Sequence, residues 1–526
     1  MLISILNFFK RNVFKNKDES NYVSFNKNQW KNHITKSKKN RILVDLFPHN
    51  PWIHFYSFIV NIFSKKLEAQ AEYFYFDLYQ GRLSKISLFI SKLKSIYESF
   101  NVTEGLSEYN FVYNLKDLQK YNKKFLSLNF NSIKLVNYQY KGIKIGDLIY
   151  DTYLRINYVP TLNFKDDKLK KIFFRAHKIC DEIEKYFKLY NVKCVFPSHV
   201  CYINYGIISR YAAKKKIPII KIFSKNKGNA GFRLLKIDDN YVLDDPPYYN
   251  YRRIFKKFSK NQKKVALKIG KNLIQKRISG ENDKNLPPFT AKSSFNNKKI
   301  KIKYNISKKK IVIFPHCFFD NPHRYRNAIF SDFYEQVKFF LDFSMRNKHI
   351  EFFYKPHPNE LMSQLNVHAQ ILEKYPHVNY LDKDISHKNI IQMKPDCVVT
   401  NHGTVSHEYA YYNIPVINTG DNPHINYDFC LHLKNKKQIY TALNNLEKLK
   451  TKLNFDKKNI YEYMYLHYEY FPNLNDEKKY LKDDYFVYKN MNKTTSSKIF
   501  RKFINQKPFV RNQIINYVNK FADKII

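Results

Sequence analysis

The strongest constraint on the fold of this chain is a regular alternation of apolar and helical segments between residues 311 and 419. Five short runs rich in β-branched and aromatic residues predict strands, at 311–315, 350–356, 378–381, 396–400 and 415–419. Helical segments are predicted between them, at 330–345, 361–374, 387–393 and 404–412. Strands that alternate with helices in this way form parallel sheets. The segment therefore predicts a doubly wound sheet.

A second set of alternating segments lies nearer the N-terminus. Strands are predicted there at 41–47, 72–78, 193–197 and 217–223, with a helix over 204–216 before the last of them. Residues 105–165 give no clear strand pattern. The fold class that follows is α/β, with two Rossmann-like doubly wound domains.

A chain of 526 residues is too long for one ordinary core and suits two domains with extensions. We predict five parts: a basic amphipathic N-terminal extension at 1–40, a Rossmann-like domain at 41–240, a linker with some helix at 241–305, a second Rossmann-like domain at 306–450 and a basic helical extension at 451–526.

The formal net charge is +47, part of which reflects a composition generally rich in lysine. A basic surface attracts anions, and we favour a membrane surface and a phosphorylated substrate over nucleic acid. Leu2, Ile5 and Phe9 share one face of a predicted N-terminal helix, and the C-terminal stretch 498–526 has a similar character. Each end either lies on a membrane surface or packs on the protein's own body.

The sequence also indicates a cellular compartment. It has no apolar run of the roughly 20 residues that a spanning helix needs, and its first residues make a poor signal peptide. The six cysteines form no CxxC pair, which is typical of buried thiols in a reducing environment. We therefore expect a cytoplasmic protein, peripheral on the inner face of the cytoplasmic membrane.

Glycine is scarce, with 11 in the whole chain against the roughly 7% that is typical of proteins. After Gly280 only Gly403 and Gly420 remain, and both lie in the segment 398–424. Gly403 ends a predicted strand and opens a helix, where backbone N–H groups can meet a phosphate. Gly420 ends the next strand, at the carboxyl edge where ligands of such sheets bind. The alternative is that both are only turn glycines.

Several side chains that could bind a phosphate or nucleotide follow the predicted strands. Lys355, His357 and Pro358 lie in YKPHPNE, where the flanking prolines hold the histidine backbone extended. An imidazole or ammonium group at this edge can hydrogen-bond a nucleotide phosphate. Thr404 can cap the following helix or donate to phosphate, and Glu408, one turn later, can accept ribose hydroxyls.

The first strand of this domain leads into FPHCFFDNPHRYRN (314–327), which carries His316, His323 and Arg324. Two histidines with Asp320 raise the possibility of a metal site, but their spacing matches no known metal motif. We favour a metal-free loop that faces the ligand. The chain also lacks GxGxxG after a strand and a P-loop, which disfavours dehydrogenases and NTP hydrolases.

A general base would have to come from the first domain. Three candidates remain open: Glu104 beside Gly105, Asp147 after Gly146, and His199 at the carboxyl end of a predicted strand. Each could take a proton from an acceptor hydroxyl.

Residues from HCFFDNPHRYRNAIF through YKPHPNE to TNHGTVSHEYAYYNIPVINTGDNPH resemble bacterial capsule and surface-polysaccharide biosynthesis proteins of the GT-B glycosyltransferase class. In outline the chain is similar to capsular Kdo transferases and bacterial polysialyltransferases, over about 140–430 and most clearly over 311–424. The resemblance implies that His357 and Pro358 form the His-Pro element that binds the nucleotide phosphate, and that Thr404 is the hydroxyl-bearing element. Only Glu104, with its neighbours, approximates the acid-and-glycine motif that supplies the base in polysialyltransferases.

The resemblance implies two domains that face a cleft, with the acceptor held by 41–240 and the nucleotide-sugar by 306–450. The expected activity is metal-independent transfer of a sugar from a nucleotide-sugar donor to a growing surface polysaccharide or lipid-linked glycan, with no cofactor. A nucleotide-sugar 2-epimerase or a glycerol-phosphate transferase on the same fold is the alternative. A non-catalytic, basic protein that binds membranes or nucleic acid is a further one.

Overall fold

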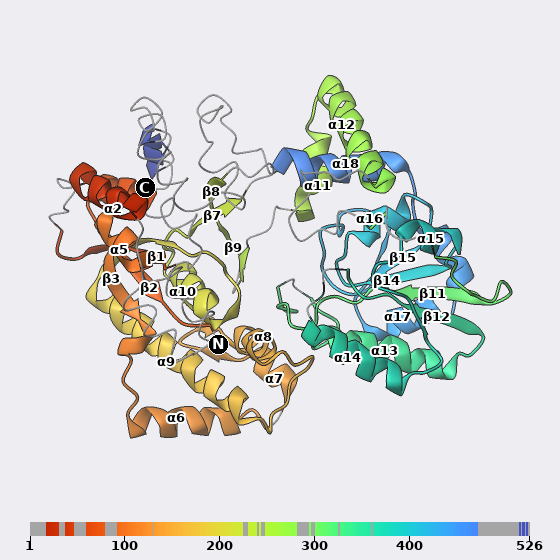
Figure 1. Cartoon of the computed structure of the whole chain (residues 1–526), viewed down its shortest axis with the longest axis horizontal. Helices are drawn as coiled ribbons and strands as arrows, with labels where there is room; N and C mark the ends of the chain where they lie inside the picture. The colour runs from red at the N-terminus through yellow and green to blue at the C-terminus, as the bar shows by residue number, and fades with distance from the viewer. Residues whose placement is uncertain are drawn as a thin grey trace. The chain divides into compact units, whose positions relative to one another are not determined.

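A computed structural model shows the fold of the chain (Figure 1). It describes residues 17–30, 37–46, 59–78, 92–129, 131–224, 230–238, 241–243, 248–280, 294–295, 300–324, 327–358, 360, 362–471, 515–516, 518–520 and 522–523. The chain forms two compact units. The first comprises Met1–Thr152, Phe164–Asp244 and Asn475–Ile526, and the second comprises Tyr153–Asn163 and Asp245–Leu474.

The first unit is built on a four-stranded parallel sheet. Its strands, in the order in which they pair, are β3 (Thr103–Ser107), β2 (Gln70–Tyr75), β1 (Asn40–Asp45) and β6 (Asn191–Phe196). A parallel bridge between Val195 and Ile219 joins β6 to the segment before β7 (Ile220–Ser224). Because the chain leaves β1 toward β2 on one side and reaches β6 on the other, the strand order reverses between β1 and β6.

Helices and short strands complete the first unit. The helices are α2 (Lys17–Trp30), α5 (Lys92–Ser99), α6 (Leu115–Leu126), α7 (Ser132–Val136), α8 (Gly146–Asn157, whose end belongs to the second unit), α9 (Asp167–Leu189) and α10 (Tyr202–Lys214). The short strands are β4 (Gln139–Tyr140), β5 (Ile143–Lys144), β7 with its partner β8 (Ala230–Leu234), and β9 (Lys236–Asp238) with β10 (Tyr241–Leu243). Residues 105–165, which gave no clear strand pattern, contain α6, α7 and α8 and only the two-residue strands β4 and β5, besides the end of β3.

The second unit contains a six-stranded parallel sheet. Its strands pair in the order β13 (Asn379–Tyr380), β12 (Ile350–Tyr354), β11 (Lys309–Ile313), β14 (Cys397–Thr400), β15 (Val416–Asn418) and β16 (Leu431–His432). Within this unit the order is therefore 3-2-1-4-5-6, the arrangement of a dinucleotide-binding fold. All five predicted strands are present, and the prediction of an α/β protein with two parallel sheets is confirmed. The sixth strand, β16, is too short to give a sequence pattern.

Helices cover both faces of this sheet (Figure 1). On one face lie α13 (Phe333–Arg346), α14 (Met362–Lys374) and α17 (Lys436–Leu443), and on the other α15 (His387–Gln392) and α16 (Val405–Ala410). Side chains alternate between the faces, as in any strand. Ile311 and Ile313 of β11 therefore pack with α13, whereas Val312 packs toward α15 and α16.

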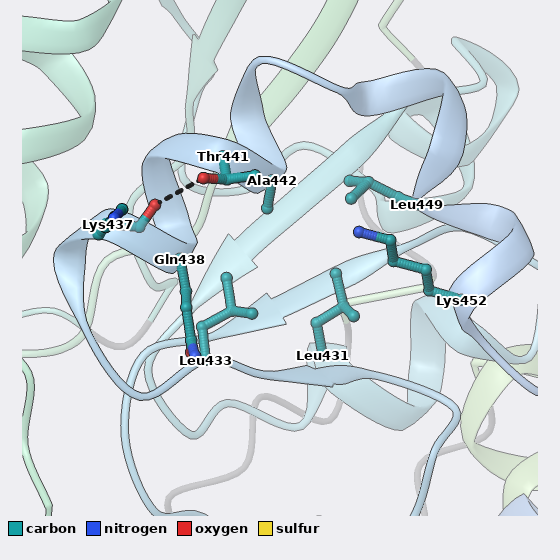
Figure 2. A pocket seen from close by; sticks show the side chains of 8 residues that line it. All are labelled: Leu431, Leu433, Lys437, Gln438, Thr441, Ala442, Leu449 and Lys452. Carbon is teal, nitrogen blue, oxygen red and sulfur yellow. Dashed lines mark hydrogen bonds between the residues drawn. The ribbon is translucent and has the colours of Figure 1, made fainter.

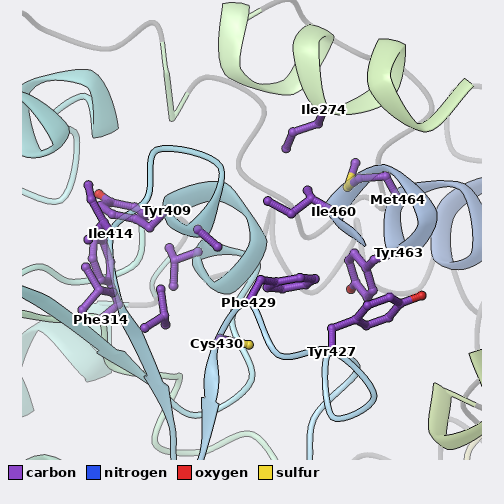
Figure 3. Close-up of a cluster of buried hydrophobic side chains, with 14 of the residues drawn as sticks. Ile274, Phe314, Tyr409, Ile414, Tyr427, Phe429, Cys430, Ile460, Tyr463 and Met464 are labelled. Atoms are coloured by element: carbon purple, nitrogen blue, oxygen red, sulfur yellow. The ribbon is translucent and has the colours of Figure 1, made fainter. Parts of the chain in front are cut away.

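Residues 241–305 are not simply a linker. They contain α11 (Tyr251–Lys256) and α12 (Lys260–Ser279), and Tyr251 and Ile274 lie in the core of the second unit. Figure 3 shows Ile274 within this core. The predicted boundary at residue 450 also divides this core, because α18 (Lys457–Tyr465) belongs to it through Ile460 and Met464. The polar composition of this region predicted a linker. Its few apolar residues nevertheless give α12 one apolar face, and this is enough for the helix to pack on the core.

Helices α12 and α18 approach each other closely at a glycine. A Cβ atom added to Gly270 would lie 1.9 Å from the backbone oxygen of Tyr461. Only glycine therefore permits this backbone-to-backbone contact. The helix α18 continues into a single π-helical turn (Leu466–Tyr470), and short 3₁₀ turns complete the described chain, at Glu108–Asn110, Tyr248–Asn250, Leu446–Lys448 and Lys450–Lys452.

The predicted N-terminal interfacial helix, with Leu2, Ile5 and Phe9, lies outside the described residues. Near the C-terminus, Val518 and Ala522 are buried in the core of the first unit, so at least this part packs on the protein's own body. Among the helices that the structure describes, none has the length and apolar character to cross a bilayer.

Candidate functional site

The order of the second sheet reverses between β11 and β14, which pair directly along Ile311–Ile313 and Cys397–Val399. Chains that leave adjacent strands in opposite directions open a crevice beyond their carboxyl ends, where doubly wound folds bind their ligands. His316 follows β11 and His402 follows β14. The strand order therefore brings these two histidines to one place.

The rings of His316 and His402 have their centroids 4.4 Å apart, and both pack on Phe333 at the start of α13. Burial lowers the pKa of His316, and the Arg324 charge adds to this effect while Asp320 opposes it. Burial, His316 and Arg324 together lower the pKa of His402. His402 was not among the predicted site residues, although its place directly before Gly403 was a usable signal.

The neighbouring strand β12 contributes Lys355 and His357. Lys355 is buried, and its ammonium group donates to the backbone oxygen of Lys383 at 3.0 Å. Burial lowers the pKa of Lys355 to about 8, although Asp384 and other carboxylates oppose the shift. Desolvation lowers the pKa of His357 to about 4, and His316 and Lys355 contribute through their charges. The side chain of His357 is exposed to water at the surface of this group of residues.

Glu360 fixes the loop that presents His357. Its Oε1 accepts the backbone N–H of His357 at 2.8 Å, and its Oε2 lies 2.5 Å from Nε2 of His368 on α14. The other ring nitrogen of His368 pairs with the hydroxyl of Tyr354 at 2.7 Å. The sequence analysis did not assign Glu360 a role, although it stands three residues after His357, the spacing of a local side-chain-to-backbone bond.

The three histidines at this edge of the sheet share one electrostatic property. Protonation of His316, His357 or His402 is opposed by a neighbouring histidine or by a Lys or Arg. An anion that enters such a cluster offsets this repulsion and favours the protonated forms. The arrangement is therefore suited to a phosphate, whose oxygens accept hydrogen bonds from imidazolium and ammonium groups.

Gly403 and Gly420 both lie at this edge of the sheet. A Cβ on Gly403 would approach Thr400 Oγ1 to 2.8 Å, which explains the glycine by close packing. Gly420 lies beside the end of β14, since its Cβ would be 3.5 Å from Asn401 Oδ1. The helix after Gly403 has only six residues, and Thr404 makes no side-chain cap to its backbone. A helix this short has a small dipole, so side chains must supply most of the positive potential.

Glu408, the expected ribose contact, is completely buried. Its Oε1 accepts the Nε–H of Arg277 at 2.7 Å, and its Oε2 lies 4.0 Å from Nδ1 of His387. Desolvation raises the pKa of Glu408, but the charges of Arg277 and His387, together with hydrogen bonds from Arg277 and Thr404, outweigh it, and the net effect lowers the pKa. The carboxylate is thus ionised and paired inside the core, and it is not open to a ligand in this structure.

The loop after β11 turns back on itself, with hydrogen bonds from Asp320 N to Cys317 O and from Arg324 N to Asn321 O. Arg324 is exposed, whereas His323 is buried. Pro358 is half-buried beside His357. In the part of the chain that the structure describes, no group of three His, Cys, Asp or Glu side chains is arranged to hold a metal ion.

The three candidate bases of the first unit lie in different surroundings. Asp147 is buried and makes two short hydrogen bonds to Arg210, of 2.6 and 2.7 Å. Glu104 is near the amino end of β3, and although desolvation raises its pKa, bonds from Tyr73 and Asn110 and the Lys94 charge give a net lowering. His199 is exposed and follows β6 at the carboxyl edge of its sheet.

A cavity of about 260 Å³ lies elsewhere in the second unit (Figure 2). It is lined mainly by α17 and the segments around it, including Leu431, Leu433, Gln438 and Leu449. None of its lining residues belongs to the predicted site, and its walls are chiefly apolar. This cavity is therefore separate from the predicted site. We assign the candidate site to the carboxyl ends of β11, β12 and β14, where His316, His357 and His402 lie.

No protein-family model and no curated protein sequence matches the chain. Among solved structures it is similar to the β-Kdo 2,4 transferase of KpsC from Thermosulfurimonas dismutans, with a TM-score of 0.31, 7% identity, and coverage of 52% of this chain and 79% of that one. It is also similar to the UDP-GlcNAc 2-epimerase of Neisseria meningitidis bound to UDP-GlcNAc, with a TM-score of 0.22 and 12% identity, over 81% of this chain and 95% of that one.

The wall teichoic acid polymerase TagF is a further similar structure, with a TM-score of 0.23 and 12% identity, covering 69% of this chain and 97% of that one. The similar structures thus include a sugar transferase, an epimerase and a polymerase. At TM-scores this low the similarities assign no activity to this chain.

Proposed function

We propose that the chain is a metal-independent glycosyltransferase that moves a sugar from a nucleotide-sugar to a growing surface polysaccharide or lipid-linked glycan. The observation that carries the proposal is the convergence of His316, His357 and His402 beyond the carboxyl ends of three neighbouring strands. This is the edge at which doubly wound sheets bind nucleotides. The sequence resemblance to capsule glycosyltransferases supports the same assignment.

In this mechanism the second unit holds the donor. The bond between the anomeric carbon and the phosphate oxygen breaks, and its electron pair remains on the departing nucleotide. Negative charge therefore grows on the phosphate in the transition state, where His357 and its cationic neighbours stabilise it. These fixed groups supply the positive charge that a divalent ion supplies in other transferases.

The basic exterior supports a location beside an anionic membrane, where a lipid-linked or growing glycan would be the acceptor. An acceptor hydroxyl attacks the anomeric carbon and must lose its proton to a base. That base would come from the first unit, for which His199, Asp147 and Glu104 are the sequence candidates.

A thermal-shift panel of CMP-, UDP-, GDP- and CDP-sugars tests the donor site. We expect at least one nucleotide-sugar to raise the melting temperature of the wild type and to lose most of this effect in His357→Ala. The matched control is His349→Ala, because His349 is an exposed histidine just before the amino end of the same strand, β12. An equal shift in both variants would contradict the assignment of His357.

Incubation of the stabilising donor without an acceptor separates transfer from epimerisation. A transferase leaves the sugar configuration unchanged under these conditions. Conversion of the donor to its 2-epimer would instead identify the chain as an epimerase and end the transferase proposal.

A further inference from the structure

Three hydrogen-bonded side chains lie at the carboxyl ends of β1 and β6, the adjacent strands between which the order of the first sheet reverses. Asp45 ends β1, and Ser198 and His199 follow β6, the strand that pairs with β1. Because the strand order reverses between β1 and β6, these residues stand where a doubly wound sheet binds its ligand. Their position in the first unit is equivalent to that of His316 and His402 in the second.

Hydrogen bonds join the three side chains. The hydroxyl of Ser198 donates to Oδ2 of Asp45, and the Ser198 oxygen lies 3.0 Å from Nδ1 of His199. Asp45 and Ser198 are buried, whereas His199 is exposed. The ring of His199 also packs near Tyr205, with centroids 5.2 Å apart. The chain of bonds thus runs from a buried carboxylate to an imidazole at the surface.

The direction of these bonds decides which nitrogen of His199 carries the proton. A serine hydroxyl has one hydrogen, and the ionised carboxylate of Asp45 accepts it. The Ser198 oxygen can then only accept from Nδ1, so Nδ1 must carry hydrogen. In a neutral imidazole the other nitrogen, Nε2, is then an unprotonated acceptor. The arrangement prepares Nε2 of His199 to take a proton.

The other two candidate bases, Asp147 and Glu104, are not poised in this way to take a proton. The Asp147 carboxylate is committed to Arg210, and Glu104 is held by Tyr73, Asn110 and Lys94. Hydrogen bonds of this kind stabilise the ionised carboxylate and weaken it as a base. Burial raises the pKa of Asp45 to about 7, although bonds from the Ser198 hydroxyl and backbone lower it in part.

We infer that His199 is the general base that deprotonates the acceptor hydroxyl, and that Asp45 and Ser198 are positioning residues that hold its Nδ1–H tautomer. This inference rests on the proposed function and adds the acceptor half of the reaction. The acceptor O–H proton passes to Nε2 of His199. The freed oxygen lone pair forms the new bond to the anomeric carbon, while the bond from that carbon to the phosphate breaks and the nucleotide leaves with the electron pair.

The tautomer can be measured without any substrate. Histidine ring nitrogens are labelled with ¹⁵N, and the His199 signals are assigned by their loss in His199→Gln. We expect Nδ1 to be protonated and Nε2 unprotonated in the wild type at about pH 8.5, where Asp45, whose pKa burial raises to about 7, is ionised. In Ser198→Ala and in Asp45→Ala, which removes the acceptor of the Ser198 hydroxyl, the protonated nitrogen should change to Nε2, whereas Ser127→Ala, which removes an exposed serine of the same unit, should leave the wild-type pattern. Protonated Nε2 in the wild type would overturn the inference.

Activity supplies the second measurement. The probe is the nucleotide-sugar that stabilises the wild type most in the panel, with glycerol as the acceptor alcohol, and nucleotide release is followed. His199→Ala should lower kcat on the order of a hundredfold or more, with little change in donor KM, and added imidazole should restore part of the loss. Ser198→Ala should give a smaller loss of kcat. Retention of kcat within about threefold in a folded His199→Ala protein would exclude the base role, since general bases contribute more than this.

The two measurements separate the inference from the proposed function. If no nucleotide-sugar binds the wild type, the transferase proposal fails, whatever the tautomer. If the donor binds and is transferred but His199→Ala transfers it normally, only the inference about the base fails.

Discussion

The imidazole rings of His316 and His402 lie 4.4 Å apart, although one follows the first strand of the second sheet and the other follows the fourth. Their contact is a direct result of the pairing of β11 with β14. Protonation of both histidines at this distance costs free energy because the two positive charges repel each other, unless an anion binds beside them. The pair is therefore the centre of the candidate donor site.

Donor affinity should increase as the pH falls from about 7 toward 6. The pKa values of His316 and His402 are lowered, so both rings are neutral near pH 7 in the free protein. A bound phosphate favours the protonated rings, and binding is then coupled to proton uptake. Nucleotide titrations by calorimetry in two buffers of different ionisation enthalpy would measure this uptake. The double variant His316→Asn with His402→Asn should abolish it, and an unchanged uptake would contradict the model.

Replacement of His357 by alanine should lower the turnover of the donor on the order of a hundredfold or more, the usual cost of removing a donor to the developing charge. His349→Ala should retain wild-type kinetics, because this exposed residue lies just before the amino end of β12. Steady-state nucleotide release measures both. Near-normal turnover in His357→Ala would mean that another group meets the leaving phosphate.

Glu360→Ala should act through His357. It removes the acceptor of the His357 backbone N–H and the partner of His368 Nε2, so the loop after β12 loses its fixed geometry. We expect weaker donor binding, by about tenfold, because one to two kcal/mol of preorganisation is lost. Glu373→Ala, at an exposed position on α14, is the control. Equal donor affinity in both variants, measured by calorimetry, would show that the bond does not support the site.

The pair of Arg277 and Glu408 should behave as a structural ion pair. Arg277→Met alone leaves a buried carboxylate without its partner and should destabilise the second unit by about 3–5 kcal/mol. The double variant Arg277→Met with Glu408→Leu should regain much of this loss, because neither charge then remains unpaired. Thermal melting of the three proteins measures the difference. A double variant that is as stable as the wild type but binds no nucleotide would instead support the predicted ribose contact of Glu408.

Acid should destabilise the second unit through His387. Burial lowers its pKa to about 3, with Lys355 and Arg277 adding to the shift and Glu408 opposing it, against an ordinary value near 6.5. Below pH 6.5 the unfolded state takes a proton that the folded state refuses, so stability is present above that pH and is lost as pH falls toward 3. His387→Phe preserves the packing against Phe314 and Phe295. For each pH unit between pH 6 and 4, the free energy of unfolding should fall by about 1.4 kcal/mol less in the variant than in the wild type. Melting experiments over this range measure the difference, and an equal fall in both proteins would contradict the prediction.

Gly270→Ala should separate α12 from α18. The added methyl group would collide with the backbone of Tyr461, and overpacking of this kind costs about 1–3 kcal/mol. Asn272→Ala, two residues later on the exposed side of the same helix, should be neutral or slightly stabilising. Melting temperatures of the two variants test whether these helices form part of the second unit's core. Equal melting temperatures would show that they do not.

The sequence by itself determined the fold class and most of the elements of both sheets, and it predicted the edge to which we assign the candidate site. Strand and helix periods are local properties, so alternating patterns from 311 to 419 could be recognised without knowledge of the fold. The positions of Lys355, His357 and Gly403 at strand ends followed from the same patterns. The two prolines around His357 added a backbone restraint that is also local.

Only the tertiary structure decided which strand ends meet. Pairing of β11 with β14 brought His402 to His316, and pairing of β1 with β6 brought Asp45 to Ser198, contacts between residues far apart in the chain. Burial of Glu408 also depended on Arg277, which lies in a region whose polar composition indicated a linker. A sequence pattern shows the face and the end at which a side chain lies, whereas its partners depend on strand order and helix packing, which long-range burial of apolar surface selects.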